Sequence, residues 1–351
     1  MNSNLKYPKA LENSNSLVAK YLTKELFEEL KDRVTINGFT LQNVINSGVQ
    51  NIDSGIGAYA GDKESYEVFA PLFDKIIEDY HGFKKDDKHK TNMNPNDLNA
   101  PNLDIDSQFI ISTRVRVARN IKDIPLGTAI SKELRDKIEQ DISQTLLSFD
   151  GELQGKYYPL NNITLDDRES LIKDHFLFKE GDRFLQSAGL NRDWPNARGI
   201  FHNSDKTFLL WINEEDQLRI ISMQQGGDIK EVFTRLVLAI KKLQEKIKFE
   251  YDKHLGYITS CPTNLGTAIR ASVHIKLPNL STKMDEFKEI ADKYSVQIRG
   301  IHGEHSDSEG GVYDISNKRR LGVSEVECVQ DMYNGVQALI KREKELRNKN
   351  Y

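Results

Sequence analysis

Residues 269–277, IRASVHIKL, alternate between apolar and polar side chains at every step. Successive side chains of a β-strand point to opposite faces of its sheet. Ile269, Val273 and Ile275 therefore share one face, and Arg270 and His274 share the other. The stretch predicts a strand with one face on a hydrophobic core and a second face that carries cationic groups.

Further stretches predict strands that can pair with this one. Residues 109–118 alternate in the same way, and residues 207–212 and 218–223 predict a hairpin around the turn 213–216. Residues 256–260 predict another strand. In the first of these stretches the apolar face comprises Ile111, Thr113, Val115 and Val117, and the polar face comprises Ser112, Arg114 and Arg116.

Helices are predicted between the strands. Asp228 followed by Glu231 resembles a capping box before a run of apolar side chains at helical spacing, and Thr164 with Asp167 makes a weaker one. Hairpins beside helices indicate an α+β fold, in which helices pack against an antiparallel sheet.

The N-terminal quarter has a different pattern. Residues 17–30 and 64–80 have apolar side chains at helical spacing. Residues 82–106 are polar, rich in Pro and Asn and without periodicity, which is typical of a linker. We therefore expect a small all-α domain at residues 1–91, a linker at residues 92–106 and a larger α+β domain at residues 107–351.

Composition excludes several classes of protein. The 351 residues include 49 Lys and Arg against 53 Asp and Glu, a net charge of −4, so the chain is a poor nonspecific partner for nucleic acids or anionic membranes. No apolar stretch approaches the ~18 residues of a membrane span, and the N-terminal sequence lacks the apolar segment of a secretion signal. The two cysteines, Cys261 and Cys328, exclude a disulfide-rich module and a zinc site made of cysteines. We expect a cytoplasmic protein with no nucleic-acid or membrane partner.

Common nucleotide-binding and hydrolytic motifs are missing from the sequence. It has no Gly-x-x-x-x-Gly-Lys-Ser/Thr loop, none of the protein-kinase motifs and no His-Glu-x-x-His. Residues 55–60 match a loose dinucleotide-binding pattern. No clear strand precedes them and their surroundings are helical, which argues against a Rossmann site.

Five arginines lie on predicted strands or at strand ends: Arg114, Arg116, Arg219, Arg270 and Arg299. Any single one is commonly part of a surface salt bridge. Five cations on one sheet are unfavourable unless they meet anions, and guanidinium groups bind phosphate oxygens in a bidentate fashion. Together these arginines favour a polyphosphate site.

Two loops allow both a structural and a functional interpretation. Residues 300–311 contain four glycines and many small polar residues, typical either of a surface loop or of a lid that orders over a ligand. Cys261 follows a predicted strand and precedes Pro262. It is either a buried, inert cysteine or, among arginines, a thiol with a lowered pKa.

Residues 261–267, CPTNLGT, resemble the signature loop of the phosphagen (ATP:guanido) kinases. Residues 112–116, 213–216 and 310–317 resemble other motifs of that family, in the family's order. The resemblance extends from about residue 17 to about residue 346. It implies a small all-α N-terminal domain and a larger domain of the glutamine-synthetase-like guanido kinase fold, with an antiparallel sheet flanked by helices.

Within the family the chain is most similar to the members that phosphorylate arginine. Glu304 stands where creatine-specific members carry an apolar residue, Thr263 stands where they have serine, and residues 53–59 resemble the short specificity loop for the larger substrate. The implied activity is reversible, Mg-ATP-dependent phosphorylation of the guanidino group of L-arginine, which gives phosphoarginine and ADP and buffers cellular ATP. Taurocyamine, lombricine and creatine are the alternative acceptors.

The resemblance also implies roles for individual residues. Those for the ATP phosphates are Arg114, Arg116, Arg219, Arg270 and Arg299, and those for the adenine and ribose are His175 and His274. The catalytic residues that contact the guanidinium are Glu215, Cys261 and Glu304. The residues for the amino-acid end of arginine are Ser54, Gly55, Ile56 and Tyr59. An ion pair is implied between Asp53 and Arg183 across the two domains, and Mg²⁺ is expected to be held by nucleotide phosphates and water, without protein ligands.

Other classes of function are weighed against this one. Bacterial protein-arginine kinases share the catalytic domain, but residues 54–57 and the helical domain favour a small-molecule acceptor. An inactive nucleotide-binding scaffold is a further class, and the complete set of site residues argues against it. We expect a monomer, with a dimer as the alternative.

Overall fold

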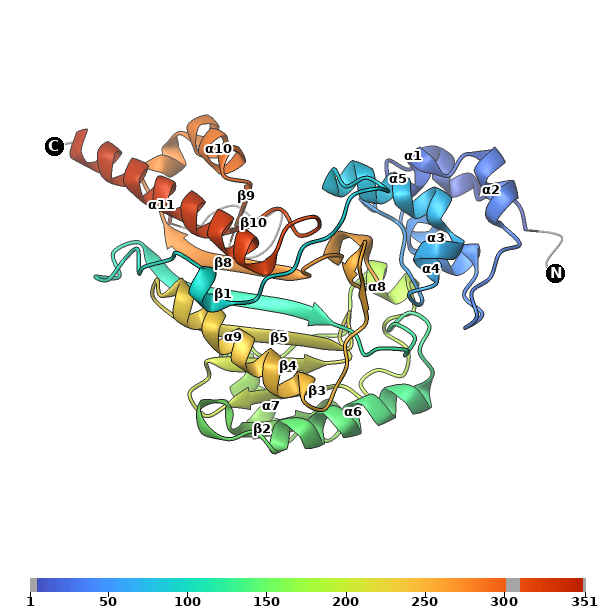
Figure 1. Ribbon diagram of the computed structural model, residues 1–351, viewed down its shortest axis with the longest axis horizontal. Coiled ribbons are helices and arrows are strands. Elements are labelled where there is room, and N and C mark those ends of the chain that lie inside the picture. Colours follow the sequence, from blue (N-terminus) through green and yellow to red (C-terminus); the bar gives the residue numbers. More distant parts are fainter. Residues whose placement is uncertain (1–4, 301–309, 350–351) are drawn as a thin grey trace.

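The structure is a computed structural model that describes residues 5–300 and 310–349. The described residues form an eight-stranded antiparallel sheet in the order β2-β3-β4-β5-β1-β8-β10-β9 (Figure 1). The strands are β1 (Ile110–Arg119), β2 (Gly155–Pro159), β3 (Gly199–Asn203), β4 (Phe208–Ile212), β5 (Leu218–Gln225), β8 (Ile269–Lys276), β9 (Val296–Gly300) and β10 (Val312–Asn317). The two strands that alternate most clearly in the sequence, β1 and β8, are neighbours in the middle of this sheet.

β1 follows the predicted alternation except at its beginning. Val115 and Val117 are fully buried, as predicted, but Ile111 is 46% exposed and Ile110 is buried in its place. The pairing of β1 with β8 shifts between Ile110 and Ser112. A β-bulge of this kind adds one residue and reverses the alternation. The prediction that Ile111 faces the core is therefore wrong.

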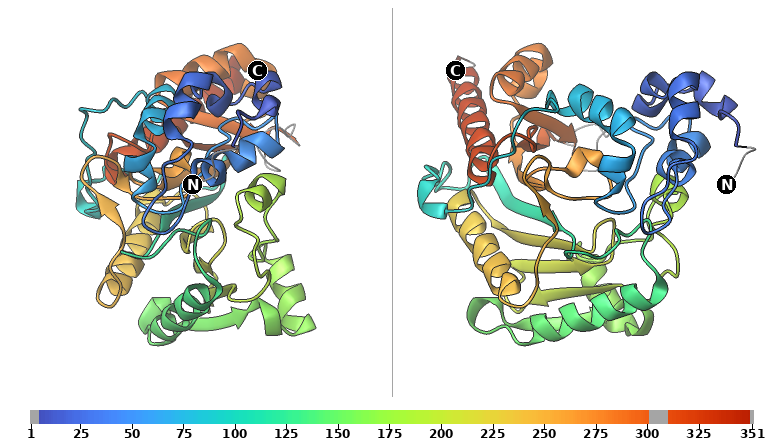
Figure 2. Two further views of the ribbon diagram at one scale, coloured as in Figure 1. Left: turned by 90° about the vertical axis from the view of Figure 1, so that its right-hand side faces the viewer. Right: turned by 45° about the vertical axis from the view of Figure 1, so that its right-hand side comes forward.

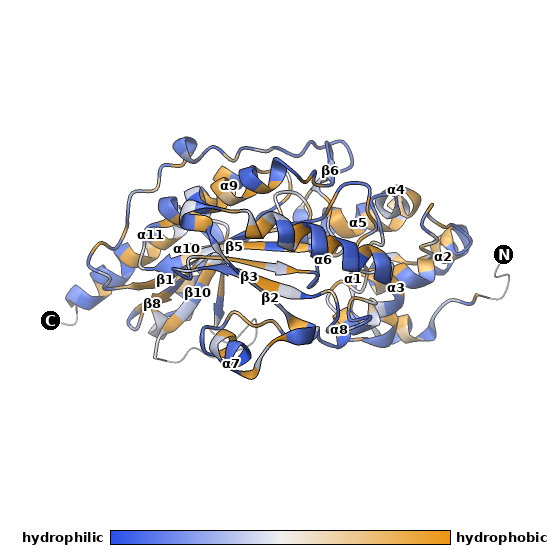
Figure 3. Cartoon of the chain, turned by 90° about the horizontal axis from the view of Figure 1, so that it is seen from below, coloured by the Kyte–Doolittle hydropathy of each residue, from blue (hydrophilic) through white to orange (hydrophobic). Residues whose placement is uncertain are grey.

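Helices cover the apolar face of the sheet. α9 packs on β1 and β5, α11 packs on β8 and β10, and α10 packs on β9 and α11. α9 begins after Asp228, whose carboxylate accepts a hydrogen bond from the Glu231 amide as the sequence predicts. Figure 3 shows hydrophobic and hydrophilic residues side by side on these helices, because one side of each helix meets the core. α7 lies on the opposite face, where Leu171 packs with Ile200, Leu209 and Ile221. The helices of the larger part are α6 (Lys132–Leu147), α7 (Leu165–Lys173), α8 (Arg183–Ser187), α9 (Ile229–Gln244), α10 (Met284–Lys293) and α11 (Glu325–Lys349).

Short helices form a separate group beyond one end of the sheet, which we call the helical part (residues 5–83; Figure 2). The periodic stretch 17–30 is two helices, because the hydroxyl groups of Ser16 and Thr23 each cap a new helix start. The helices are α1 (Leu17–Tyr21), α2 (Lys24–Leu30), α3 (Leu41–Gln50), α4 (Ser65–Val68) and α5 (Ala70–His81). Their apolar side chains build a second hydrophobic cluster, distinct from the core beneath the sheet.

This second cluster extends beyond the helical part. Leu126, Ile258, Leu265 and Leu321 come from loops around the sheet and pack into it. The helical part is therefore joined to the sheet by apolar contact as well as by the chain.

Residues 84–109 connect the two parts. They contain one 3-10 turn, Pro95–Asp97, and neither an α-helix nor a strand. They are irregular, as their composition predicts. The segment is nevertheless held against the larger part. Glu325, the first residue of α11, accepts hydrogen bonds from the Thr91 hydroxyl and the Asn92 backbone amide at 3.1 and 3.0 Å, and Leu98 is buried in the core.

The predicted strand 256–260 is wrong in its extent. Gly256–Tyr257 forms the short strand β7, which pairs with β6 (Tyr251–Asp252), and the chain then turns into the 3-10 turn Pro262–Asn264. Among the helices of the described residues, none has both the length and the apolar composition needed to cross a membrane.

Candidate active site

Neighbouring strands bring arginine side chains to one face of the sheet. Arg116 on β1 lies opposite Arg270 on β8, and Ala118 lies opposite Arg219 on β5. Arg114 is two residues before Arg116 on β1. Because alternate residues of a strand share a face, these four guanidinium groups project from the side that α9 and α11 leave uncovered.

Strands β10 and β9 continue this row of polar side chains. Asp314 on β10 lies opposite His274 on β8 and opposite Arg299 on β9. Its carboxylate accepts a hydrogen bond from Arg270 at 2.5 Å, and the His274 Nε2 lies 3.4 Å away. Burial alone would raise the pKa of Asp314, but His274 and Arg270 outweigh burial and lower it.

The arginines of this face disfavour one another's charge. Burial, followed by repulsion from Arg270 and Arg219, lowers the pKa of Arg114 to about 10. The pKa of Arg116 is also well below its ordinary value, because of burial and the charges of Arg219 and Arg114. The Nε atoms of Arg114 and Arg270 are buried without a hydrogen-bond partner among the described residues. Phosphate oxygens would relieve the repulsion and accept these hydrogen bonds.

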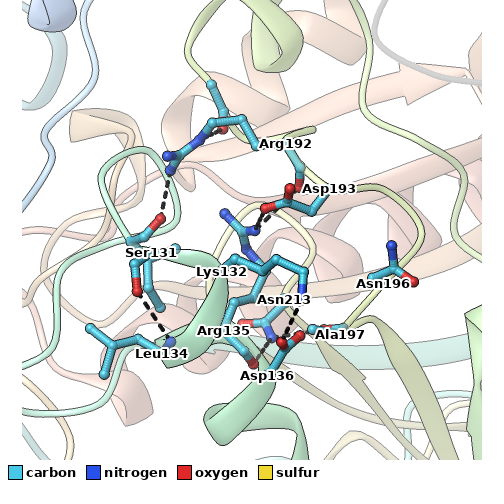
Figure 4. A network of polar contacts seen from close by, with 12 residues as sticks. Ser131, Lys132, Leu134, Arg135, Asp136, Arg192, Asp193, Asn196, Ala197 and Asn213 are labelled. Atoms are coloured by element: carbon cyan, nitrogen blue, oxygen red, sulfur yellow. Dashed lines mark hydrogen bonds and ion pairs between the residues drawn. The ribbon is translucent and has the colours of Figure 1, made fainter.

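The β4–β5 turn, residues 213–216, is fixed from behind by a polar network (Figure 4). Asn213 has the left-handed φ of 55°, and its amide donates to the carbonyl oxygens of Arg135 and Ala197 at 3.2 and 2.8 Å. Arg198 donates through Nε to the Asn213 carbonyl at 3.1 Å. The turn that carries the acidic residues is thus a rigid support.

Glu215, on this turn, contacts both the arginine face and the 261–267 loop. Its carboxylate accepts from Arg219 Nη2 at 3.0 Å and from Asn264 Nδ2 at 3.3 Å. Burial raises the pKa of Glu215 to about 7, and Arg219 opposes that shift. Such a carboxylate can pair with a cation and also exchange a proton near neutral pH.

Cys261 is buried beside the same carboxylate. The residue is 8% exposed, and its Sγ lies 3.1 Å from the Thr263 hydroxyl. Burial and the negative charge of Glu215 raise the pKa of the thiol to about 12. Of the two interpretations of Cys261 that the sequence allows, the ligand-free structure agrees with the buried cysteine and not with a lowered pKa, because the charge that acts on the thiol most is a carboxylate.

Tyr59 lies close to these two groups. Burial raises the pKa of its hydroxyl, and the charges of Cys261 and Glu215 raise it further. The adjacent Ala60 amide donates to the carbonyl oxygen of Ser260, the residue before Cys261, at 2.8 Å. The helical part therefore contributes one of its predicted site residues to the immediate surroundings of the thiol.

Ser54, Gly55 and Ile56 follow α3 in the chain and form a loop that contacts the first turn of α1. The carbonyl groups of Gly55 and Ile56 accept hydrogen bonds from the amides of Leu17 and Val18 at 3.0 and 3.1 Å. The Ser54 side chain is buried, whereas Gly55 is exposed. The backbone of this loop is thus fixed by the first turn of α1.

Asp53 and Arg183 form a bidentate ion pair between the helical part and α8. One of its hydrogen bonds, from Nη1 to Oδ1, measures 2.8 Å, and Nη2 bonds the second carboxylate oxygen. The Asn46 amide donates to the Ser187 carbonyl nearby at 2.7 Å. Figure 2 shows α8 beside the blue helices, far from it in sequence but adjacent in space.

The other predicted site residues are placed as follows. His274 is 43% exposed on the arginine face, and His175 is exposed in the loop that follows α7, with a φ of 57°. Glu304 lies outside the described residues. Within residues 5–300 and 310–349, no three His, Cys, Asp or Glu side chains are grouped so that they could hold a metal ion.

Sequence reasoning missed Asn264 and Arg320. Arg320 donates to the Asn264 side-chain oxygen at 2.7 Å and to the Thr263 carbonyl at 3.0 Å, while Asn264 also donates to Glu215. The two residues thus join the arginine face to the acidic turn. Both lie in loops, where no periodicity marks them, and the adjacent arginines 319 and 320 were an available signal. Arg320 lines a small cavity together with Arg116, Arg219 and Arg270.

Comparison with known families gives two matches. The N-terminal domain of the ATP:guanido phosphotransferases matches residues 12–78, and their C-terminal catalytic domain matches residues 137–346. Curated relatives are arginine kinases. That of Anthopleura japonica is 56% identical over 95% of this chain, and the arginine kinase Lit v 2 of Penaeus vannamei is 53% identical over 96% of it. The chain spans 95% of the Penaeus protein but 47% of the Anthopleura protein.

Solved structures of similar shape are guanidino kinases. A lombricine kinase has a TM-score of 0.92 and 38% identity, with 99% of this chain and 96% of that chain covered. The duplicated taurocyamine kinase from Schistosoma mansoni has a TM-score of 0.90 and 42% identity, with 97% of this chain and 48% of that chain covered. This chain belongs to the ATP:guanido phosphotransferase family.

Proposed function

We propose that this protein is an arginine kinase, which transfers the γ-phosphoryl group of Mg-ATP reversibly to a guanidino nitrogen of L-arginine. The observation that carries this proposal is the junction of two sites. A face of mutually repelling arginines meets a buried carboxylate and thiol through Arg219 and Asn264. A polyphosphate on the first and a guanidinium beside the second would lie next to each other.

The arginine face is proposed to hold the nucleotide phosphates. Phosphoryl transfer needs alignment and neutralisation of charge more than covalent chemistry. Preformed cations on adjacent strands supply both without reorganisation at the moment of reaction. The residues assigned to the phosphates are Arg114, Arg116, Arg219, Arg270 and Arg299, and those assigned to the adenine and ribose are His175 and His274.

Glu215 and Cys261 are proposed to hold the guanidinium of the acceptor. As the new N–P bond forms and the bond from the γ-phosphorus to ADP breaks, the attacking nitrogen loses a proton. Glu215, whose pKa lies near neutrality, is a suitable acceptor for it. Glu304 is proposed as a second carboxylate on sequence grounds alone, and Tyr59, Ser54, Gly55 and Ile56 are proposed for the amino-acid end of arginine.

Mg²⁺ is proposed to arrive with the nucleotide, bound by phosphate oxygens and water, which is its usual mode in phosphoryl-transfer sites. The free state of both cysteines fits a reducing compartment, and we propose the cytoplasm. We propose a monomer, with a dimer as the alternative.

The test is an assay of ADP release with Mg-ATP and a panel of acceptors: L-arginine, taurocyamine, lombricine and creatine. We expect kcat/KM to be greatest for L-arginine and Glu215→Gln to lose about 10²–10³-fold, the usual effect of one preorganised electrostatic contact. Equal or better turnover of another acceptor would overturn the choice of substrate. An absence of turnover with all four would overturn the activity.

A further inference from the structure

The loop that carries Cys261 makes few hydrogen bonds of its own. Within residues 259–264, the backbone amide of Asn264 and the Thr259 hydroxyl both donate to the Cys261 carbonyl, at 3.0 and 2.9 Å. The carbonyl groups of Thr259 and Ser260 are not bonded within this loop, whereas that of Pro262 accepts from the Leu265 backbone amide at 3.4 Å. Thr259 and Ser260 are completely buried, so their carbonyl groups need donors from the protein.

The helical part supplies a donor to each of these three carbonyl groups. The Tyr66 hydroxyl donates to the Thr259 carbonyl at 2.8 Å, and the Ala60 amide donates to the Ser260 carbonyl at 2.8 Å. The His81 Nε2 lies 2.8 Å from the Pro262 carbonyl. Four consecutive carbonyl groups around the thiol are therefore bonded, and three of the partners come from α4, α5 and the segment before them.

Packing holds the Tyr66 side chain in place, and the His81 ring has a defined protonation state. Tyr66 is 4% exposed, and its ring packs against Phe73 with centroids 4.7 Å apart. Burial lowers the pKa of His81 to about 4, so the ring is neutral near pH 7. A carbonyl oxygen only accepts hydrogen bonds, which places the single ring proton on Nε2.

We infer that the helical part positions the Cys261 thiol for the proposed reaction, with Tyr66 and His81 as positioning residues. This inference rests on the proposed function. It gives the helical part a second task besides the proposed contact with the amino-acid end of arginine, because the same segment 59–66 carries Tyr59 and also donates hydrogen bonds to the thiol loop through Ala60 and Tyr66. Small displacements of a reacting group cost rate even when every group is present.

Tyr66→Phe and His81→Leu remove the donors while leaving most of the packing. Tyr7→Phe is the matched control, since the Tyr7 hydroxyl donates to the Leu22 carbonyl at 3.0 Å wholly within the helical part. His81→Gln is the conservative variant, because its amide nitrogen can donate to the same carbonyl. Urea unfolding of each variant separates loss of stability from loss of position.

Two readouts report on the position of the thiol. One is the rate at which iodoacetamide alkylates Cys261, followed by mass spectrometry of the peptide. The other readout is a comparison of kcat and KM for arginine with KM for ATP. For Tyr66→Phe and His81→Leu we expect faster alkylation and a two- to tenfold fall in kcat/KM for arginine, about the effect of one hydrogen bond. KM for ATP should stay within about twofold, and His81→Gln should recover most of the loss.

The inference is overturned if both variants behave as Tyr7→Phe does, with lower stability but unchanged alkylation and kinetics. It is also overturned if KM for ATP changes as much as KM for arginine. Failure of the proposed function is a separate result: the wild-type protein would not turn over arginine, whereas the alkylation rates would still report whether the loop moves.

Discussion

At the scale of single residues, the protonation of the site depends on which neighbours reach each group. Glu215 is the charged group that most affects the pKa of Cys261, and Arg219 donates a hydrogen bond to that same carboxylate. The sequence places a cysteine among arginines but does not say which side of the loop the thiol faces. A guanidinium bound beside both groups would favour the thiolate and the carboxylate together.

The Cys261 thiol of the ligand-free protein should therefore lose its proton only at high pH. Burial and Glu215 raise the pKa of Cys261 to about 12, and the thiolate is the form that is alkylated. We expect the alkylation rate of Cys261 in the ligand-free protein to rise with pH at least to about pH 10 without levelling off. Peptide mapping distinguishes Cys261 from Cys328. A plateau near pH 8 would contradict the assigned environment.

Glu215 should release protons when arginine binds. Its pKa in the fold, about 7, exceeds its ordinary value of 4.5, chiefly because of burial. The folded protein thus holds this proton more tightly than the unfolded chain does. Its contribution to stability is greatest below pH 4.5 and is lost as the pH rises towards 7. A guanidinium beside the carboxylate would lower the pKa again.

Calorimetry measures this release directly. Titration of arginine into the protein near pH 6.5, in two buffers with different ionisation enthalpies, should show proton release, and Glu215→Gln should abolish it or reduce it strongly. Proton uptake in the wild-type protein, or equal release in both proteins, would show that Glu215 is already ionised or does not meet the ligand.

At the scale of elements, alternation in the sequence was enough to place the central strands and the arginines on them. Arg116 and Arg270 face each other in register, as two strands with cationic polar faces would. The exceptions have local physical causes. A bulge reverses the face of Ile111, and a cap at Thr23 divides one periodic stretch into two helices. The contacts of Asn264 and Arg320 come from loops, which have no period to read.

Substitutions of Asn213 in the β4–β5 turn test how far the position of Glu215 depends on the hydrogen bonds that hold this turn. Asn213 combines a left-handed backbone with two side-chain hydrogen bonds to carbonyl groups. Asn213→Gly removes the hydrogen bonds but tolerates the backbone, and Asn213→Ala also adds about 1–2 kcal/mol of strain. We expect the wild-type protein to be most stable in urea and Asn213→Ala least, with kcat falling in the same order. Equal stability of Ala and wild type would mean that the turn is fixed by Arg198 and its neighbours alone.

At the scale of the whole molecule, the interface between the helical part and the sheet could not be predicted from the sequence. Tyr66 and Thr259 are separated by 193 positions and meet at 2.8 Å, and no local pattern reports such a contact. The family resemblance anticipated one pair, Asp53 with Arg183. The apolar contacts of Leu126 and Ile258 with the helical cluster depend on how loops of the sheet fit the helices, which composition and periodicity do not encode.

This interface has two separate regions of contact, and they should respond differently when substrates bind. The contacts at residues 259–260 are buried and that of His81 with Pro262 is partly buried. The Asp53–Arg183 pair, by contrast, has both side chains exposed and is weakened by solvent and salt. If the two parts move on binding, the buried contacts should persist and the exposed side should close. Asp53→Asn should then raise KM for arginine modestly, with little effect on kcat.

Small-angle scattering can detect the movement itself. With Mg-ADP, nitrate and arginine present together, planar nitrate stands in for the transferring phosphoryl group, and we expect a smaller radius of gyration than for the free protein. Closure would exclude water from a phosphoryl group that could otherwise be hydrolysed. The same titration with Asp53→Asn should need more arginine to reach the compact state. An unchanged radius, with binding verified by calorimetry, would mean that the two parts are already arranged for the reaction and that Asp53 and Arg183 only fasten them together.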